Sequence, residues 1–443
     1  MPAEALRNYQ YHFCKDLWYN RNKRKTKGGE RMNDYAPRHR VILHCDMNNC
    51  YASIEMKLNP ELRGKAIAVC GSKEQRHGIV LAKSDLAKKK GVTTGEAIWQ
   101  AQLKCPELII VPPHFSEYRK YSEAAKAIYA EYTDYVEPFG LDECWLDVTG
   151  SRRLFGDGET IAHTIRNRIK NELGITVSIG VSFNKIFAKL GSDLKKPDAV
   201  TVIGAYEYPW IVGPLPVGDL LGVGKKTAEK LRSYCIYTIG DLAECKPEWL
   251  KRHFGKQGEW LWHAANGLDH TPVRHIDDRD PPKSIGRGTT LPKDLYNKAE
   301  VWPVLIALSD VVGKELHKSK FLAGGVQLTI RNSAFVDRQI QMPCRIATRN
   351  PKELAQYAMQ MFERHYIFDL PVRALTVRAI QLQEENTPLQ IRFDEDIAHR
   401  ERRDKLEKAA LALEDRFGAG VVHLARSGET ASYKVKSEKL KVK

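Results

Sequence analysis

The sequence predicts an α+β fold in which a helical part separates two parts that contain strands. Short apolar runs, typical of buried strands, alternate with helical patterns over residues 41–203. Residues 204–277 hold short helical stretches broken by glycines, and strand patterns return over residues 284–385. A chain of 443 residues is long enough for about three domains.

Each expected element rests on a local pattern. The first strand is an apolar run that begins with β-branched residues, a helix stops at Gly91, and a third helix repeats aromatic and small residues at helical spacing. In the first part we expect strands at 41–45, 66–70, 108–111 and 174–181, and helices at 52–58, 83–90, 118–135 and 184–194. Later in the chain we expect strands at 325–331, 338–343 and 374–382, and helices at 299–317, 351–366 and 399–417.

Composition narrows the class of protein. The chain has 70 Lys and Arg against 55 Asp and Glu, a net charge of +15, which favours a polyanionic partner without separating DNA, RNA and anionic lipid. The longest apolar stretch is too short to cross a membrane, and the first residues lack the apolar core of a signal peptide. The 9 cysteines form no C-x-x-C pair, which argues against a zinc module or a disulfide framework and for a reducing cytoplasm.

The ends of the chain differ from the rest. Residues 1–40 are rich in Lys and Arg and show no persistent period, so they are either a basic arm that contacts phosphates or a leader that precedes a start at Met32. Residues 278–283 are polar and contain proline, as expected of a linker. Residues 386–443 are expected to form a charged helix and a basic tail.

Two acidic sites have the most chemical content. Asp46 closes the first apolar strand, and Asp142 and Glu143 lie in another segment flanked by apolar residues. Carboxylates brought together near a buried strand repel one another unless a cation compensates them, and ligand sets made of oxygen favour Mg²⁺ or Mn²⁺. Two such ions can activate an attacking oxygen and stabilise a leaving phosphate oxygen. Alternatively, Asp46 caps the next helix and Asp142 belongs to a turn after Gly140.

Three motifs carry a resemblance to a known family. Three segments resemble, in order, the motifs of the Y-family translesion DNA polymerases. They are Asp46-Met-Asn-Asn-Cys-Tyr-Ala-Ser-Ile-Glu55, Leu141-Asp-Glu-Cys-Trp-Leu-Asp147 and the segment from Val177 to Pro197. The bacterial DNA polymerase IV type is the one that they most resemble. The resemblance covers most of the chain, from about residue 41 to residue 385.

The resemblance implies a right-hand polymerase with a ferredoxin-like palm, small fingers, a helical thumb with a helix-hairpin-helix and an α+β little finger domain. It implies that two Mg²⁺ ions are held by Asp46, Asp142, Glu143 and the Met47 carbonyl. Because adjacent strand residues face opposite sides, Asp142 and Glu143 can serve one site together only where the backbone bends.

The resemblance also implies a nucleotide site. Tyr51 takes the steric-gate position, where a rigid ring excludes a ribose 2′-hydroxyl; the alternative is a core aromatic where strand meets helix. The amides of Asn49 and Cys50 begin a helix and are expected to bind triphosphate oxygens.

Lys88 and Lys196 are the expected triphosphate cations. Lys196 precedes Pro197 as in relatives, whereas Lys88 stands where relatives carry Arg and Asp85 where they carry Tyr. Since Lys offers a point charge in place of a fork, this contact departs from the family pattern, and Lys88 can also be read as part of a solvated helix face.

The expected DNA contacts lie further along the chain. Gly222, Gly224 and Lys225 resemble the turn of a helix-hairpin-helix, which presents backbone amides to a phosphate; an ordinary helical hairpin is the alternative. Arg287 and Arg331 are expected to contact the DNA backbone. The implied domains are palm (41–57 and 115–203), fingers (58–114), thumb (204–277) and little finger (284–385).

The resemblance therefore predicts low-fidelity translesion synthesis on primer-template DNA with dNTPs, without proofreading, by a monomeric, cytoplasmic and nucleoid-associated enzyme. Residues 387–393 resemble a sliding-clamp peptide weakly. Two alternatives remain: another two-metal nucleotidyl enzyme on a similar palm, such as a nucleotide cyclase, and a non-catalytic DNA-binding repair factor that keeps the fold.

Overall fold

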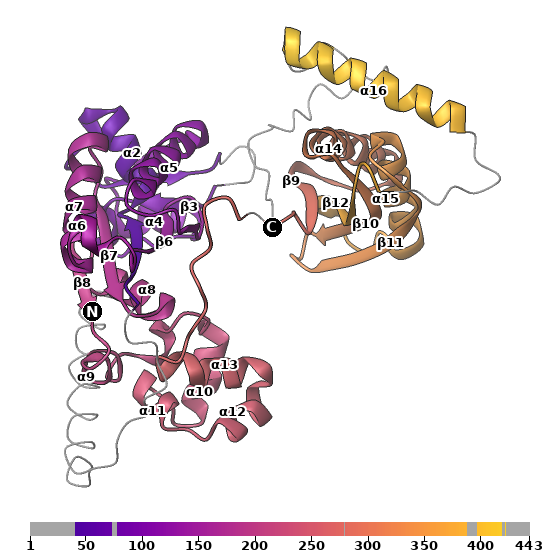
Figure 1. The fold of residues 1–443 in the computed structure, drawn as a ribbon. Coiled ribbons are helices and arrows are strands. Elements are labelled where there is room, and N and C mark those ends of the chain that lie inside the picture. Colours follow the sequence, from indigo (N-terminus) through magenta and orange to yellow (C-terminus); the bar gives the residue numbers. More distant parts are fainter. Residues whose placement is uncertain (1–39, 73–77, 279, 388–396, 419–420, 422–443) are drawn as a thin grey trace. The chain divides into compact units, whose positions relative to one another are not determined.

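A computed structural model describes residues 40–72, 78–278, 280–387, 397–418 and 421. Nearly all of the predicted N-terminal extension, the clamp-like segment after residue 387 and most of the C-terminal tail lie outside these residues. Apart from residues 72–77, the chain divides at residue 279 into two compact units, which we describe one at a time (Figure 1).

The first unit is built on a five-stranded sheet in the order β5-β6-β1-β7-β8. Its strands are β1 (Ile42–Met47), β5 (Val136–Pro138), β6 (Glu143–Asp147), β7 (Val177–Ser182) and β8 (Val200–Ile203). The central strand β1 pairs antiparallel with both β6 and β7, whereas β7 pairs parallel with β8. Every residue of β1 is buried as a result.

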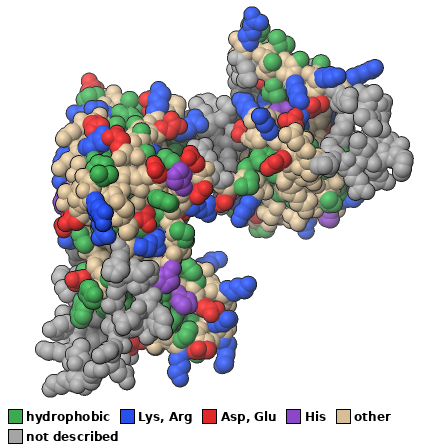
Figure 2. All heavy atoms as spheres, viewed as in Figure 1, with side chains coloured by type: hydrophobic (Ala, Val, Ile, Leu, Met, Phe, Trp, Pro, Cys, Tyr) green, Lys and Arg blue, Asp and Glu red, His purple; other side chains and the backbone are tan. Residues whose placement is uncertain are grey.

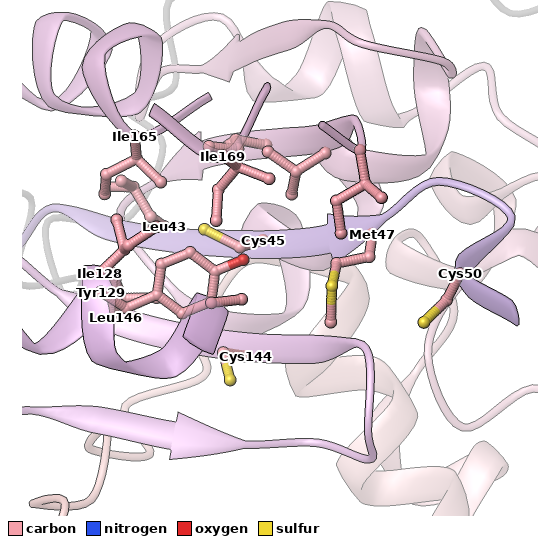
Figure 3. Close-up of a cluster of buried hydrophobic side chains, with 14 of the residues drawn as sticks. Leu43, Cys45, Met47, Cys50, Ile128, Tyr129, Cys144, Leu146, Ile165 and Ile169 are labelled. Atoms are coloured by element: carbon pink, nitrogen blue, oxygen red, sulfur yellow. The ribbon is translucent and has the colours of Figure 1, made fainter. Parts of the chain in front are cut away.

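Helices cover both faces of this sheet: α5 (Phe115–Ala130) and α7 (Gly158–Arg168) on one face and α8 (Lys185–Leu194) on the other. Leu43 and Cys45 of β1 point into the main core, which α5 and α7 complete (Figure 3). Ile42 packs on the opposite side with Ala188 of α8. Because side chains alternate along a strand, Asp46 shares the α8 face with Ile42.

Helix α8 lies unusually close to β7. A Cβ atom built on Gly180 of β7 would stand 1.9 Å from the carbonyl oxygen of Ala188 and 2.5 Å from the amide nitrogen of Ser192. Glycine at this position therefore lets the helix backbone rest directly on the strand, and this close contact fixes the height of α8 above Asp46.

A smaller three-stranded sheet, in the order β3-β2-β4, belongs to the same unit. It consists of β2 (Ile67–Cys70), β3 (Val80–Lys83) and β4 (Ile109–Val111), with α3 (Asp85–Lys89) and α4 (Ile98–Lys104) beside it. The helix expected at 83–90 begins later because Lys83 still pairs in β3 with Ala68, and the Ser84 side chain caps the helix by accepting a hydrogen bond from the Ala87 amide.

The remaining helices of the first unit are short. Those near the sheets are α2 (Cys50–Leu58), η1 (Pro60–Leu62), α6 (Arg152–Phe155) and η2 (Ile169–Leu173). The helical part beyond β8 contains α9 (Tyr208–Val212), η3 (Val217–Asp219), α10 (Lys225–Ser233), α11 (Ile239–Ala243), α12 (Pro247–Phe254) and α13 (Lys256–Ala265). This part has its own apolar core, to which Leu231 and Leu261 contribute.

The second unit is a four-stranded antiparallel sheet in the order β11-β10-β12-β9, packed against two helices. Its strands are β9 (Ser284–Leu295), β10 (Phe321–Asn332), β11 (Asp337–Thr348) and β12 (Val372–Glu384), and its helices are α14 (Lys298–Ser319) and α15 (Pro351–His365). One side of the sheet and the inner faces of both helices form one apolar core.

A further helix, α16 (Ile397–Phe417), contacts this unit through charged groups. Arg349 donates to Asp404 at 2.7 Å, Lys314 donates to Glu414 at 2.8 Å, and His317 lies 3.2 Å from Glu407. Leu406 and Phe417 of the same helix are exposed. The contacts that attach α16 are therefore largely ionic.

Within the described residues, no helix is both long enough and apolar enough to span a membrane.

The contact between α8 and β7 predicts a loss of stability for Gly180→Ala. The new methyl group must push the helix backbone away, and overpacking of this kind costs about 1–3 kcal/mol or more. Urea unfolding should show the loss. Gly150→Ala is the control, because a Cβ there meets nothing within 4 Å; equal midpoints for the two variants would contradict the close packing.

Candidate active site

Three carboxylates meet at one end of the five-stranded sheet. Asp46 is the penultimate residue of β1, and Glu143, the first residue of β6, is its direct partner in the antiparallel register. Asp142 precedes β6 in a bend, where its carbonyl oxygen accepts a hydrogen bond of 3.0 Å from the Met47 amide. Because of this bend, Asp142 does not share the regular alternation of β6, so Asp142 and Glu143 can face the same site although they are adjacent in sequence.

Electrostatic coupling shows that these groups act on one another. Burial raises the pKa of Asp46 to about 6; Lys196 opposes this rise, and the Glu143 carboxylate adds to it. The pKa of Asp142 is raised by burial first and by the charge of Asp46 second. A cation bound between the carboxylates would stabilise their ionised forms.

Two lysines already supply positive charge. Lys196 Nζ lies 2.6 Å from an oxygen of Asp46 and 2.9 Å from an oxygen of Asp193. Lys189 Nζ lies 2.8 Å from an oxygen of Glu143. Lys189 belongs to α8 and Lys196 follows it, so the close contact of α8 with the sheet delivers both ammonium groups.

The donors at this site are of the chemical type that binds a hard divalent cation. In the part of the chain that the structure describes, no three His, Cys, Asp or Glu side chains are arranged to hold a metal ion as they stand. The ammonium groups of Lys196 and Lys189 pair with Asp46 and Glu143. Carboxylate and backbone carbonyl oxygens are the ligands that Mg²⁺ prefers, and these are the groups present.

The loop that carries Lys196 is tied to the end of β1. Buried Asn48 accepts a hydrogen bond of 2.8 Å from the Asp198 amide and donates one of 2.9 Å to Ser178. Lys170 adds an ion pair of 2.7 Å to the Asp198 side chain. The backbone next to Lys196 is therefore fixed relative to Asp46.

Tyr51 is held as a rigid platform on α2. Its ring stacks on Tyr118 of α5, with 4.2 Å between centroids and an interplanar angle of 9°. The Tyr118 hydroxyl donates to the buried carboxylate of Glu55, and His114 Nδ1 lies 2.9 Å from the same carboxylate. The charge of Asp142 contributes to the raised pKa of Tyr51, after burial and Cys50. The ring therefore lies beside the carboxylates with little freedom to turn.

Asn49 and Cys50 form the start of α2. Asn49 adopts a left-handed backbone conformation with φ 47°, and its side chain donates to Asp85 of α3 at 2.8 Å instead of capping its own helix. The Cys50 thiol is buried and burial raises its pKa, so it does not act as a nucleophile. The Asn49–Asp85 hydrogen bond brings the starts of α2 and α3 together.

Lys88 is exposed on α3, within one turn of Asp85. Its charge contributes, after burial, to the lowered pKa of Lys83 at the end of β3. The small sheet therefore presents two neighbouring lysines and one carboxylate near the start of α2.

The predicted helix-hairpin-helix residues lie at the entry to α10. Gly222 has φ +87°, and a Cβ there would stand 2.5 Å from the ring of Trp260, so only glycine fits without strain. Gly224 precedes α10 without a side-chain cap, and exposed Lys225 is its first residue. With Asp219 and Arg232, Lys225 lines a hollow of about 260 Å³.

The two predicted DNA-binding arginines of the second unit are placed differently from each other. Arg331 is half exposed and forms a bidentate ion pair with Asp337 at 2.6 and 2.7 Å. Arg287 is 7% exposed, and its Nε and Nη1 atoms have no hydrogen-bond partner among the described residues. Burial lowers the pKa of Arg287.

Sequence reasoning missed Lys189 and His44. Buried His44 has Nδ1 at 2.8 Å from Ser192 Oγ and Nε2 at 4.0 Å from Glu143. Burial and then the charge of Lys189 lower its pKa well below the usual value. A signal for Lys189 was present, because it stands four residues after Lys185 in the expected helix, which puts both lysines on one helix face.

Comparisons with known proteins agree with this geometry. Residues 45–193 match the model of the impB/mucB/samB family, and residues 282–393 match that family's C-terminal domain. Residues 218–269 match a model described as the DNA polymerase-iota thumb domain.

Several relatives are similar along most of the chain. DNA polymerase IV of Acetivibrio thermocellus is 48% identical over 86% of this chain and 95% of its own length. DNA polymerase IV 1 of Bacillus subtilis is 37% identical over 91% of this chain and 95% of its own length. The solved structure of a Y-family DNA polymerase chimera matches the fold with a TM-score of 0.69 at 24% identity, covering 77% of this chain and 99% of that one.

The long family matches and the high identity over most of the chain thus agree with the right-hand fold and with the carboxylate cluster. The chain belongs to the impB/mucB/samB family, the Y-family DNA polymerases, and within it to the DNA polymerase IV type.

Proposed function

We propose that this chain is a template-directed DNA polymerase that extends a primer 3′-hydroxyl with dNTPs and releases pyrophosphate, in low-fidelity synthesis across damaged DNA. The observation that carries the proposal is the meeting of Asp46, Asp142 and Glu143 beside the held ring of Tyr51. A carboxylate cluster is suited to nucleotidyl transfer, and a rigid aromatic ring beside it is suited to selecting the type of sugar in the nucleotide. The names of the relatives point to the same reaction.

We propose that Asp46, Asp142, Glu143 and the Met47 carbonyl hold two Mg²⁺ ions. Bound there, the ions supply positive charge to the attacking hydroxyl and to the leaving phosphate oxygens. The protein's own part is to keep the three carboxylates in place, through the register of β1 with β6 and through the ion pair of Lys189 with Glu143.

Four further residues are proposed to hold the triphosphate: Lys196 and Lys88 through their ammonium groups, and Asn49 and Cys50 through their amides at the start of α2. Lys196 already lies at the site, whereas Lys88 lies on α3, to which the Asn49–Asp85 hydrogen bond connects α2. A backbone amide at a helix start suits a phosphate oxygen. Tyr51 is proposed to lie under the sugar and to exclude a 2′-hydroxyl.

We propose that the duplex is bound mainly through its backbone. Gly222, Gly224 and Lys225 present amides and charge at the start of α10, and Arg287 and Arg331 belong to the strands of the second unit. Figure 2 shows Lys and Arg side chains mixed with Asp and Glu over the visible surface instead of gathered in one patch. Contacts with phosphates position DNA without reading its sequence, as a template-directed polymerase requires.

The finer organisation is part of the proposal. Palm, fingers, thumb and little finger are assigned to the ranges given above, and the enzyme is proposed to act as a monomer associated with the nucleoid.

Clamp binding through residues 387–393 is proposed on the sequence alone. A comparison of sliding-clamp capture by the full chain and by a chain without residues 386–398 tests it.

Primer extension with Mg²⁺ tests the function. Wild-type protein should extend a primed template, also across an abasic site, and Asp142→Ala should reduce the rate by about a thousandfold because a carboxylate proposed to hold the Mg²⁺ ions is lost. Glu123→Ala, an exposed carboxylate of α5, is the matched control. Wild-type protein that binds DNA without extending it would favour a non-catalytic repair factor, and turnover that needs no primer-template would favour another nucleotidyl enzyme.

Replacing the aromatic ring at position 51 tests sugar discrimination. Tyr51→Ala should raise the ratio of kcat/KM for rNTP over dNTP by about 10- to 100-fold, since a steric contact of this kind is worth about 1–3 kcal/mol. Tyr51→Phe keeps the ring and should behave like wild type. Unchanged discrimination in Tyr51→Ala, measured by single-nucleotide insertion, would assign the ring to packing alone.

A further inference from the structure

Asp46, a proposed metal ligand, forms an ion pair within the protein. Its side chain is 7% exposed, and one of its oxygens accepts a hydrogen bond of 2.6 Å from Lys196 Nζ. A buried carboxylate bound this closely by an ammonium group is already neutralised, so any other cation must compete with Lys196 for it.

Lys196 has more than one anion within reach. Its Nζ also lies 2.9 Å from Asp193, which is 41% exposed, and its own side chain is 28% exposed. The Lys196 ammonium can therefore leave Asp46 toward the solvent side without repacking the core. The neighbouring backbone stays in place, because Asn48 and Lys170 hold Asp198.

The triphosphate assigned to this site would offer Lys196 a stronger anion than Asp193. A lysine that moves from Asp46 to a phosphate vacates the carboxylate as the nucleotide arrives. When the nucleotide draws Lys196 away, the affinity of Asp46 for a metal ion rises. Because such coupling is reciprocal, a metal ion bound at Asp46 raises the affinity for the nucleotide by the same factor.

We propose that Lys196 is a built-in cation that weakens divalent metal binding at Asp46 until a nucleotide draws it away, so that metal and nucleotide load together. This inference rests on the proposed function, because it takes the metal and the triphosphate from it. It makes Lys196 a positioning residue for the metal site as well as a phosphate contact.

Mn²⁺ binding to the full-length, nucleotide-free protein, followed by electron paramagnetic resonance, tests the proposal. Lys196→Met removes the competitor and should bind Mn²⁺ about tenfold more tightly than wild type, a difference of about 1.4 kcal/mol. Lys196→Arg keeps the charge and should retain the weaker, wild-type affinity. A merely structural role for Lys196 would lower or preserve the affinity of the Met variant, not raise it.

Lys185→Met is the matched control. Lys185 is the first residue of α8, the helix that precedes Lys196, and forms an ion pair of 2.7 Å with Glu137, which is not among the proposed metal ligands. Lys185→Met should leave the Mn²⁺ affinity unchanged. An equal gain in affinity in Lys185→Met and Lys196→Met would overturn the proposal, because the gain would then follow from the change in net charge and not from the Lys196–Asp46 contact.

A second measurement adds a non-hydrolysable dNTP analogue. The analogue should raise the Mn²⁺ affinity of the wild-type protein several-fold more than it raises the Mn²⁺ affinity of Lys196→Met. Equal or weaker Mn²⁺ binding by a Met variant whose near-ultraviolet circular dichroism is native would overturn the proposal, even with normal wild-type primer extension. Loss of wild-type extension would instead overturn the proposed function.

Discussion

Repulsion between acidic side chains at the end of β1 is the constraint on which the rest of the site depends. The pairing of β1 with β6 sets Asp46 opposite Glu143, and the bend before β6 adds Asp142. The apolar core under β1 holds that strand in place, so the carboxylates cannot separate to relieve their repulsion (Figure 3). The fold stabilises the cluster with lysines.

Helix α8 connects global packing to local charge. Because Gly180 allows the helix backbone to rest on β7, Lys189 reaches Glu143 and the following residues bring Lys196 to Asp46. Most residues of α8 are buried, so its position is set by the core and not by the ion pairs. The site's charge balance is therefore a property of sheet and helix packing.

Much of this could be predicted from sequence, and the remainder depended on tertiary contacts. Most strands and the long helices of the second unit followed from apolar periodicity, whereas β3, β5, β6 and β8 were missed because such short runs become strands only by pairing with their neighbours. The carboxylates were identified by motif, but the ion pair of Lys189 depends on which face α8 turns to the sheet. The Asn49–Asp85 and Arg331–Asp337 contacts join side chains whose partners no local pattern names.

The attachment of α16 has a consequence of a different kind. Pairs such as Arg349 with Asp404 and Lys314 with Glu414 each have one partner about one third exposed, so dissolved ions reach them in part; at about 1 M salt the screening length falls to about 3 Å. The apolar core of the second unit is indifferent to such screening. A rise in ionic strength therefore weakens the docking of this terminal helix and leaves the apolar core of the domain intact.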